Sequence, residues 1–410
     1  MPSALDLGFV RAQFPAFSET SLRDGVFLEN AGGSYACAPV LERLQQYYRR
    51  LKVQPYYPYP ASSEAGAWMD AAHEALARYL NVATDEVQFG PSTSQNTYVL
   101  AQAFSELLHA GDEIIVTNQD HEANSGVWRR LGARGIVIRE WSVDRGTGAL
   151  DPGQLETLIG ERTRLLVFPH CSNIVAQINP VATITARARA AGVISVVDGV
   201  SYAPHGLPDV SALGADIYLF SLYKTFGPHQ GLMVVRRAVM DQLGNQGHYF
   251  NASQPRKRLV PAGPDHAQVA ASRGIAEYFD ALDAHHGGGD DAGRPARVRA
   301  LLSGAERPLV QQLLDALSAR HDLRVLGPSE ATKRAATIAI VPHPDAEPMA
   351  IVRSLASEGV MAAAGHFYSV RLLEAIGIDP ARGVVRLSLA HYNSSSDIER
   401  ALAALEQALA

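Results

Sequence analysis

The stretch FSLYKTFGPHQG (220–231) decides the fold, because it connects two apolar runs and carries a lysine between them. DIYLFS (216–221) leads into it, and GLMVV (231–235) continues from it. Both runs are short and mostly apolar, which is typical of buried β-strands. Lys224 therefore follows the end of a strand, where a charge without a partner is costly. This position raises the question of what the lysine does.

Four further apolar runs come earlier in the chain and are also expected to be strands: EIIVT (113–117), GIVIREW (135–141), RLLVF (164–168) and GVISVVD (192–198). A helical pattern closed by glycine, TITARARAAG (183–192), lies between the last two runs. Strands and helices thus alternate over this region. Such alternation predicts an α/β fold with a mostly parallel sheet covered on both faces.

After about residue 265, the alternation of short apolar runs and helical patterns ends. The glycine-rich segment AHHGGGDDAGRP (284–295) predicts a flexible surface loop. Its histidines, His285 and His286, are expected to be loop residues, and no metal site is predicted. Longer helical stretches follow. The final helix is expected to open on Ser396, with Glu399 completing a capping box.

These differences divide the chain into two expected domains. The large α/β domain is expected to span residues 20–268. A smaller α+β domain is expected to combine residues 1–19 with residues 269–410. No internal repeat is visible in either part.

Composition narrows the classes of protein to which the chain can belong. It has 410 residues, 47% of them apolar, and a formal net charge of −6, which argues against nucleic acid or an anionic membrane as the main partner. No apolar run reaches the roughly 18 residues needed to span a bilayer. Cys37 and Cys171 are the only cysteines. Two cysteines do not make a disulfide framework, so a cytoplasmic location is expected.

Polar residues follow the ends of four predicted strands. Ligands bind at the carboxyl ends of the strands in open α/β sheets, so these side chains are expected to converge on one crevice. They are Asp120, His121, Asn124, His170, Ser172, Asn173, Asp198, Ser221, Tyr223 and Lys224.

A lysine and an aspartate at two strand ends suggest a specific chemistry. A lysine amine forms a Schiff base with pyridoxal phosphate (PLP). The pyridine nitrogen of that cofactor then needs an acidic partner, so that the ring can accept electrons. Lys224 and Asp198 suit these two roles. Taken alone, Lys224 is more simply interpreted as a solvated loop residue and Asp198 as a turn residue before glycine.

The cofactor's phosphate would need backbone amides and hydroxyl groups, best supplied at the start of a helix. Ser92, Thr93 and Ser94 precede an apolar helical pattern and meet this requirement. Their simpler interpretation is a helix cap without a ligand. His121 is placed to lie flat on the cofactor ring, or else to be a surface histidine.

The order of these segments resembles the class V aminotransferase family of fold type I PLP enzymes. The resemblance lies with its cysteine desulfurase-like and isopenicillin N epimerase-like branch and covers nearly the whole chain. Seven segments carry it: FLENAGGSY (27–35), PSTSQN (91–96), QDHEAN (119–124), HCSNIVAQINPV (170–181), VVDGVSYAPH (196–205), SLYKTFGPHQG (221–231) and VVRLSLAHYNSSSDIERAL (384–402).

The resemblance implies a role for each matched residue. Lys224 would carry the Schiff base, Asp198 would bind the pyridine nitrogen and His121 would stack on the ring. Arg386 would bind a substrate carboxylate. The full set implied for the cofactor is Ser92, Thr93, Ser94, His121, Asn173, Asp198, Ser201, Ser221, Tyr223 and Lys224. The set implied for the substrate is Gly32, Asn173, Tyr368 and Arg386.

Five positions depart from the desulfurase pattern. Tyr223 replaces a histidine before the lysine, and Ser201 replaces a glutamine after the aspartate. Pro264 replaces a threonine that reaches the neighbouring subunit's phosphate. Ala363 stands where a second arginine is found. Tyr368, in GHFYS, occupies the position of the cysteine that forms the persulfide, so sulfur transfer through a protein persulfide is not expected.

These features predict a PLP enzyme that acts on an amino acid or a cysteine S-conjugate, with C–S bond cleavage by β-elimination as the first choice. An aminotransferase, an epimerase or a decarboxylating enzyme of the same fold are the alternatives. A non-catalytic PLP-binding protein is a further alternative, although it would need a basic nucleic-acid-binding segment that the sequence does not show.

Two expectations concern surfaces. The resemblance implies a homodimer, since fold type I sites are built at a subunit interface. The segment PYYPYP (55–60) is read either as a stiff loop that packs on itself or as a wall of the substrate pocket.

Overall fold

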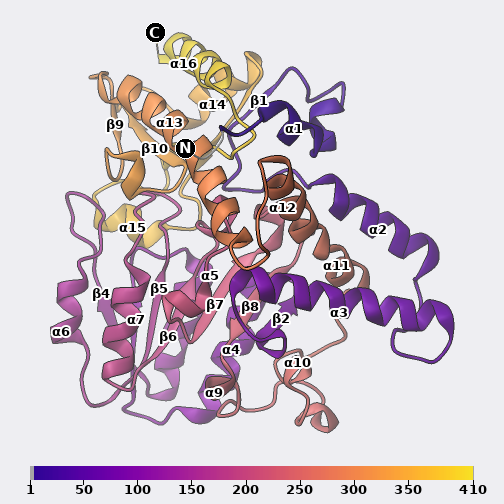
Figure 1. Ribbon diagram of the computed structural model, residues 1–410. Coiled ribbons are helices and arrows are strands. Elements are labelled where there is room, and N and C mark those ends of the chain that lie inside the picture. The colour runs from indigo at the N-terminus through magenta and orange to yellow at the C-terminus, as the bar shows by residue number, and fades with distance from the viewer. Residues whose placement is uncertain (1–3, 410) are drawn as a thin grey trace.

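The computed structural model describes residues 4–409, so residues 1–3 and 410 of the expected small domain lie outside the described range. Figure 1 shows a large sheet flanked by helices, with a second, smaller sheet packed beside it near the C-terminus. The helices α2 and α3 form an arm that stands out from this body.

The large sheet has seven strands in the order β2-β8-β7-β6-β5-β3-β4. Their bounds are β2 Val87–Gly90, β3 Glu113–Thr117, β4 Val137–Trp141, β5 Thr163–Pro169, β6 Ile194–Asp198, β7 Ile217–Ser221 and β8 Gly231–Val235. The five strands from β7 to β4 are mutually parallel, and only β8 pairs antiparallel with its neighbours. The predicted α/β class with a mostly parallel sheet is therefore confirmed.

Both faces of the large sheet are buried, as the apolar runs predict. Along β5, Leu165 and Val167 contribute to one hydrophobic cluster, while Leu166 and Phe168 contribute to the other. Side chains alternate along a strand, so one continuous apolar run supplies two cores. The sheet thereby becomes a rigid platform whose strand ends are fixed relative to one another.

Helices cover these faces and build the second lobe. Their bounds are α1 Leu7–Ala12, α2 Ala38–Arg50, α3 Pro60–Leu80, α4 Thr93–Leu107, α5 Glu122–Arg129, α6 Leu155–Leu158, α7 Val181–Ala190, α8 Val210–Leu213, α9 Arg237–Met240, α10 Pro255–Arg258, α11 His266–Ala271, α12 Arg273–His285, α13 Arg294–Ser318, α14 Pro348–Ser357, α15 Val370–Ala375 and α16 Ser395–Leu409. Among residues 4–409, no helix is long and apolar enough to cross a membrane.

The smaller sheet is antiparallel and has the order β12-β13-β10-β9. Its strands are β9 Leu323–Val325, β10 Thr337–Pro342, β12 Ala363–Gly365 and β13 Val384–Ser388. An N-terminal segment returns to this sheet. There β1 (Val26–Phe27) pairs with β11 (Val360–Met361), and Ser388 donates its backbone N–H to Leu28. Residue 29 is thus held beside β13.

The opening stretch forms the connection between β7 and β8, which are antiparallel neighbours with Ser221 opposite Gly231. Phe226 adopts a left-handed backbone conformation, with φ of 63°. That conformation costs a non-glycine residue about 1–2 kcal/mol, so surrounding contacts must hold it. Ser34 Oγ accepts a hydrogen bond from the Phe226 N–H, and Cys37 donates to the Phe226 carbonyl. The turn that carries Lys224 is therefore fixed by the N-terminal segment.

Two local expectations for the C-terminal half are corrected. The capping box of α16 is formed by Ser394 and Asp397, not by Ser396 and Glu399: Asp397 donates its backbone N–H to Ser394 Oγ, and Ser394 donates its own to the Asp397 carboxylate. The helix begins before Ser396, at Ser395, so both predicted positions lie inside it. His285 ends α12 instead of lying in the loop, and its ring stacks on Phe9.

Gly231 offers a test of how tightly β8 packs on the start of α4. A Cβ at position 231 would lie 2.3 Å from the carbonyl carbon of Ser92. Because backbone atoms must then move, Gly231→Ala should destabilise the protein by about 1–3 kcal/mol in chemical denaturation. Gly304→Ala is the matched control. This glycine lies inside α13 with no atom near its missing Cβ, so alanine should raise the free energy of unfolding by about 0.5–1 kcal/mol. Equal stability of the two variants would contradict this packing.

Candidate active site

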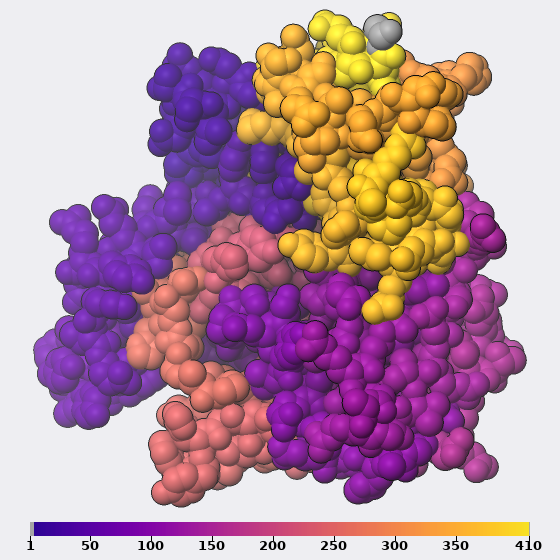
Figure 2. All heavy atoms as spheres, turned by 180° about the vertical axis from the view of Figure 1, so that it is seen from behind, coloured from indigo at the N-terminus to yellow at the C-terminus, as the bar shows by residue number. Residues whose placement is uncertain are grey.

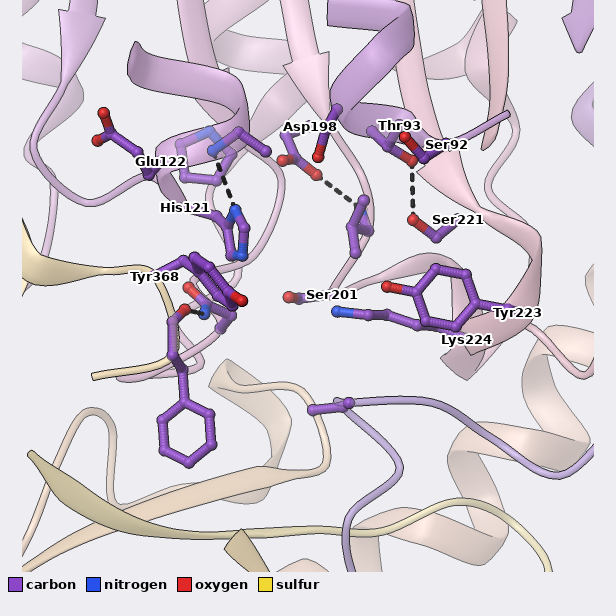
Figure 3. A pocket seen from close by; sticks show the side chains of 18 of the residues that line it. Ser92, Thr93, His121, Glu122, Asp198, Ser201, Ser221, Tyr223, Lys224 and Tyr368 are labelled. Carbon is purple, nitrogen blue, oxygen red and sulfur yellow. Dashed lines mark hydrogen bonds between the residues drawn. The ribbon is translucent and has the colours of Figure 1, made fainter. Parts of the chain in front are cut away.

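One cleft of about 600 Å³ lies at the carboxyl ends of the parallel strands, where the GHFYS segment and β13 approach the large sheet. Figure 3 shows the side chains around it. The residues that the resemblance assigns to the cofactor and the substrate all line this cleft: Gly32, Ser92, Thr93, Ser94, His121, Asn173, Asp198, Ser201, Ser221, Tyr223, Lys224, Tyr368 and Arg386. Residues that are far apart in the chain therefore face one space.

Lys224 ends the short 3-10 turn that follows β7, and its side chain extends into the cleft (Figure 3). In the described part of the chain, its Nζ forms no hydrogen bond or ion pair; the nearest ring is Tyr223, 5.8 Å from Nζ. Burial and, secondarily, the positive charge of Arg386 lower the pKa of Lys224 to about 8. A lysine in this state supplies neutral amine close to neutral pH.

Asp198 is the last residue of β6, the strand beside β7. It is buried, and its Oδ1 accepts a hydrogen bond from the backbone N–H of Val200 at 2.8 Å. Burial raises the pKa of Asp198 to about 6, although the Val200 N–H and Lys224 oppose this rise. No ion pair to this carboxylate is present in the described residues, so it is poised to accept a cation or a protonated ring nitrogen.

Hydroxyl groups gather at the start of α4. Ser92 caps the helix by accepting the backbone N–H of Gln95, and Thr93 Oγ1 lies 2.8 Å from Ser221 Oγ. Gly231 lets β8 approach this helix start closely. The N-terminus of a 15-residue helix with exposed amides and hydroxyls is suited to a phosphate.

His121 is the N-cap of α5, and its Nδ1 accepts the backbone N–H of Ala123. Burial, followed by the charges of Lys224 and Arg386, lowers the pKa of His121 to about 3. The imidazole is therefore neutral, which suits stacking on a ring. The Tyr368 ring lies 5.1 Å from it, at the exposed side of the cleft.

Asn173 connects the large sheet to the GHFYS segment. It donates from Nδ2 to the Phe367 carbonyl at 3.0 Å, and its Oδ1 accepts from Ser369 Oγ at 2.7 Å. Phe367 and Tyr368 both have left-handed backbone angles, with φ of 48° and 58°. The amide of Asn173 thus holds a strained turn over the cleft.

Arg386 lies in β13 and is almost fully buried. Its Nη2 donates to Glu29 Oε1 at 2.8 Å, and the Phe367 ring lies 3.8 Å from the guanidinium carbon. Sequence reasoning quoted Glu29 and Phe367 within motifs but gave neither a role. The sequence shows Glu29 only as an acidic residue three positions before Gly32. Its pairing with Arg386 becomes visible only in the tertiary structure.

Four strand-end residues that were expected in the crevice serve the framework and do not line the cleft: Asp120, Asn124, His170 and Ser172. Asp120 accepts hydrogen bonds from Thr117 and Asn124 side chains, and burial raises its pKa to about 7. The His170 ring stacks on Tyr202 at 3.6 Å. The hydroxyl of Ser172 accepts two backbone N–H groups of the following turn.

The comparisons with known proteins agree with this arrangement. The family model described as aminotransferase class-V matches residues 26–257 and 301–401. The chain is 34% identical to the aminotransferase-like protein FGM3 of Gibberella zeae over 99% of both chains. It is 29% identical to a probable cysteine desulfurase of Pseudomonas putida, with 97% of each chain covered.

Solved structures show the same fold. The cysteine desulfurase CsdA of Escherichia coli superposes with a TM-score of 0.83 at 24% identity, covering 99% of both chains. A cysteine desulfurase of Thermococcus onnurineus gives 0.86 at 21% identity, with the same coverage. The chain belongs to the class V aminotransferase family, whose members are fold type I enzymes that depend on pyridoxal phosphate.

The cleft itself fits that cofactor. An unpaired buried amine, a buried carboxylate without a cation and a helix start with hydroxyl groups are the three groups that PLP requires. Lys224 would hold its aldehyde carbon, Asp198 its pyridine nitrogen and Ser92 with Thr93 its phosphate.

The lowered pKa of Lys224 predicts how cofactor-free protein takes up PLP. Below a pH of about 8 the side chain is an ammonium that cannot attack, so the rate of covalent capture should rise with pH and level off above this value. The absorbance change on mixing the cofactor-free protein with PLP measures this rate. Lys257→Ala should behave as wild type and Lys224→Ala should show no covalent capture. A midpoint near 10.5, the ordinary lysine value, would contradict the assigned environment.

Proposed function

We propose that the protein is a PLP-dependent C–S lyase, which cleaves a cysteine S-conjugate by β-elimination. The observation that best supports this proposal is the shortage of reactive sulfur in the cleft. Tyr368 stands at the desulfurase cysteine position, and the one sulfur among the cleft-lining residues is that of Cys171. A persulfide needs a thiolate that can reach the substrate.

Neither cysteine has the properties of such a thiolate. Cys171 is buried and lies 3.3 Å from the carbonyl oxygen of Ala176, while Cys37 is buried in the core at the start of α2. Burial raises the pKa of both thiols to about 12. A lyase needs no protein nucleophile for sulfur, so this cleft suits elimination better than sulfur transfer.

When bound, PLP supplies an electron sink that lowers the cost of removing a proton from the substrate's α carbon. Lys224 Nζ is the base that takes this proton, because its lowered pKa leaves the amine free to accept it. The electron pair of the broken C–H bond leads to cleavage of the Cβ–S bond. The sulfur departs as a thiolate and takes up a proton, and water then completes conversion of the carbon skeleton to pyruvate and ammonia.

Other residues orient and shield the reacting atoms. Asp198 stays ionised against a cationic ring nitrogen, because that charge offsets the burial that raises its pKa. Neutral His121 covers one side of the cofactor position. Arg386 binds the substrate carboxylate by a forked, charge-assisted pair. Tyr368 and Phe367 wall the side from which the thiol leaves.

Transamination is the second candidate. It is favoured by the 34% identity to an aminotransferase-like protein and by a lysine that can return its proton to a different carbon. The products separate the two reactions: an aminotransferase keeps the side chain intact on a keto acid and needs an amino acceptor.

Product analysis with a panel of amino acids and cysteine S-conjugates tests the lyase directly. We expect S-conjugates to yield pyruvate, ammonia and a free thiol in equal amounts, and the Cys37→Ser, Cys171→Ser double variant to keep this activity. Alanine with a protein-bound persulfide, together with a dead double variant, would overturn the lyase assignment. A keto acid with its side chain intact would establish transamination instead.

We further propose that the protein is a homodimer. The resemblance implies a site at a subunit interface, and exposed aromatic residues support this. At the tip of the α2–α3 arm, Tyr57 and Tyr59 stack on each other in solvent and do not line the cleft of their own chain. Tyr249 and Phe250 are 88% and 64% exposed. Figure 2 shows both segments projecting on the same side of the molecule.

Analytical ultracentrifugation tests this proposal. We expect twice the chain mass of 44.1 kDa at working concentration, because aromatic side chains on this scale are costly to leave in water. Tyr249→Ser with Phe250→Ser should shift the equilibrium towards monomer. An active wild-type monomer would contradict the proposal.

A further inference from the structure

The guanidinium of Arg386 already has an acidic partner within the chain. Its Nη2 lies 2.8 Å from Glu29 Oε1, and the two side chains are 4% and 26% exposed. Arg386 is thus enclosed, whereas the Glu29 carboxylate is open to the cleft that it lines. A substrate carboxylate that approaches Arg386 therefore also approaches Glu29, since both line the cleft.

The geometry of a guanidinium places Glu29 and a substrate carboxylate on the same nitrogen. A carboxylate binds arginine most strongly through two parallel N–H groups, and both forked edges use Nη2 together with either Nη1 or Nε. Glu29 engages Nη2. Nη1 makes a long contact of 3.4 Å to the Asn173 carbonyl, and Nε is buried with no partner in the described chain. Arg386 therefore keeps an unused donor at Nε, while Glu29 engages one of the two N–H groups of Nη2, the nitrogen common to both forks.

Glu29 reaches Arg386 because position 32 is glycine. A Cβ on Gly32 would lie 1.9 Å from Glu29 Oε2, so any larger residue would push the carboxylate away. The backbone of Glu29 is anchored by a bridge to Ser388, two residues beyond Arg386. The side chain, in contrast, is held in the described chain by the Arg386 pair, and it can turn into the cleft without moving the strand.

We propose that Glu29 is a specificity-determining residue that occupies Arg386 in the free enzyme and is exchanged for the carboxylate of the substrate. The proposal rests on the proposed function in one respect, namely that the substrate carries a carboxylate bound by Arg386. Two carboxylates on one buried arginine repel, so the substrate binds weakly unless Glu29 leaves. Glu29 thereby weakens the binding of every monocarboxylate. It favours ligands that also bind the Glu29 side chain after it has left Arg386.

Binding of propionate to the PLP-loaded enzyme, followed by calorimetry, tests this exchange without any reaction. Propionate carries the carboxylate and lacks an amine, and propionamide is the neutral control. Removal of the competitor in Glu29→Gln should tighten propionate binding about tenfold and leave propionamide binding unchanged. Unchanged or weaker propionate binding by Glu29→Gln would overturn the proposal, as would no binding by either protein.

Two more variants keep the test decisive if Glu29→Gln folds poorly. Gly32→Ala keeps the glutamate but displaces it from Arg386, so propionate should again bind more tightly. Glu29→Gln combined with Arg386→Ala should lose propionate binding, because the tightening depends on the guanidinium. Glu64→Gln, which removes a carboxylate paired with Arg50 on the surface, is the matched control and should bind propionate as wild type does.

The propionate binding test can be interpreted independently of the product analysis that tests the proposed function. Propionate undergoes no elimination or transamination, so tighter binding by Glu29→Gln establishes the exchange whichever products the enzyme makes. If pyruvate and thiol appear but propionate binding is unaffected by position 29, the lyase assignment stands and the exchange is wrong.

Discussion

The burial of one amine and one carboxylate at neighbouring strand ends is the constraint on which the rest of the structure depends. Lys224 follows β7 and Asp198 ends β6, and these strands are hydrogen-bonded neighbours. Burial pushes the pKa values of both groups towards neutrality, to about 8 and about 6. The two groups are costly for folding, and a sheet with two packed faces holds them where a cofactor can use them.

The smaller sheet and the N-terminal segment complete the site from the other side. They carry Arg386 and Glu29, and the strained turn at Phe367 contacts both the guanidinium and Asn173. The Glu29–Arg386 pair and the wall of the cleft are therefore joined by direct contacts. On the proposed function, substrate recognition belongs to elements outside the sheet that positions the lysine and the aspartate.

Sequence reasoning identified the α/β architecture because the apolar runs are continuous, and a continuous run indicates a strand buried on both faces. It also grouped the cleft residues that follow a strand or begin a helix, whereas Gly32, Tyr368 and Arg386 came only from the family resemblance. It could not find the Glu29–Arg386 pair, which joins residues 357 positions apart. The expectation that Asp120, Asn124, His170 and Ser172 line the crevice was wrong, because a strand end fixes a position but not the direction of a side chain. The cap of the final helix was misplaced because Ser394, Ser395 and Ser396 follow one another and offer equivalent caps.

The central claim is that Lys224 is the residue that binds pyridoxal phosphate covalently. The chain contains four lysines, Lys52, Lys224, Lys257 and Lys333, so one experiment distinguishes them. Borohydride reduction of the loaded protein, followed by peptide mapping, should place the cofactor on Lys224 alone. A label on one of the other three lysines, or no label at all, would contradict the account.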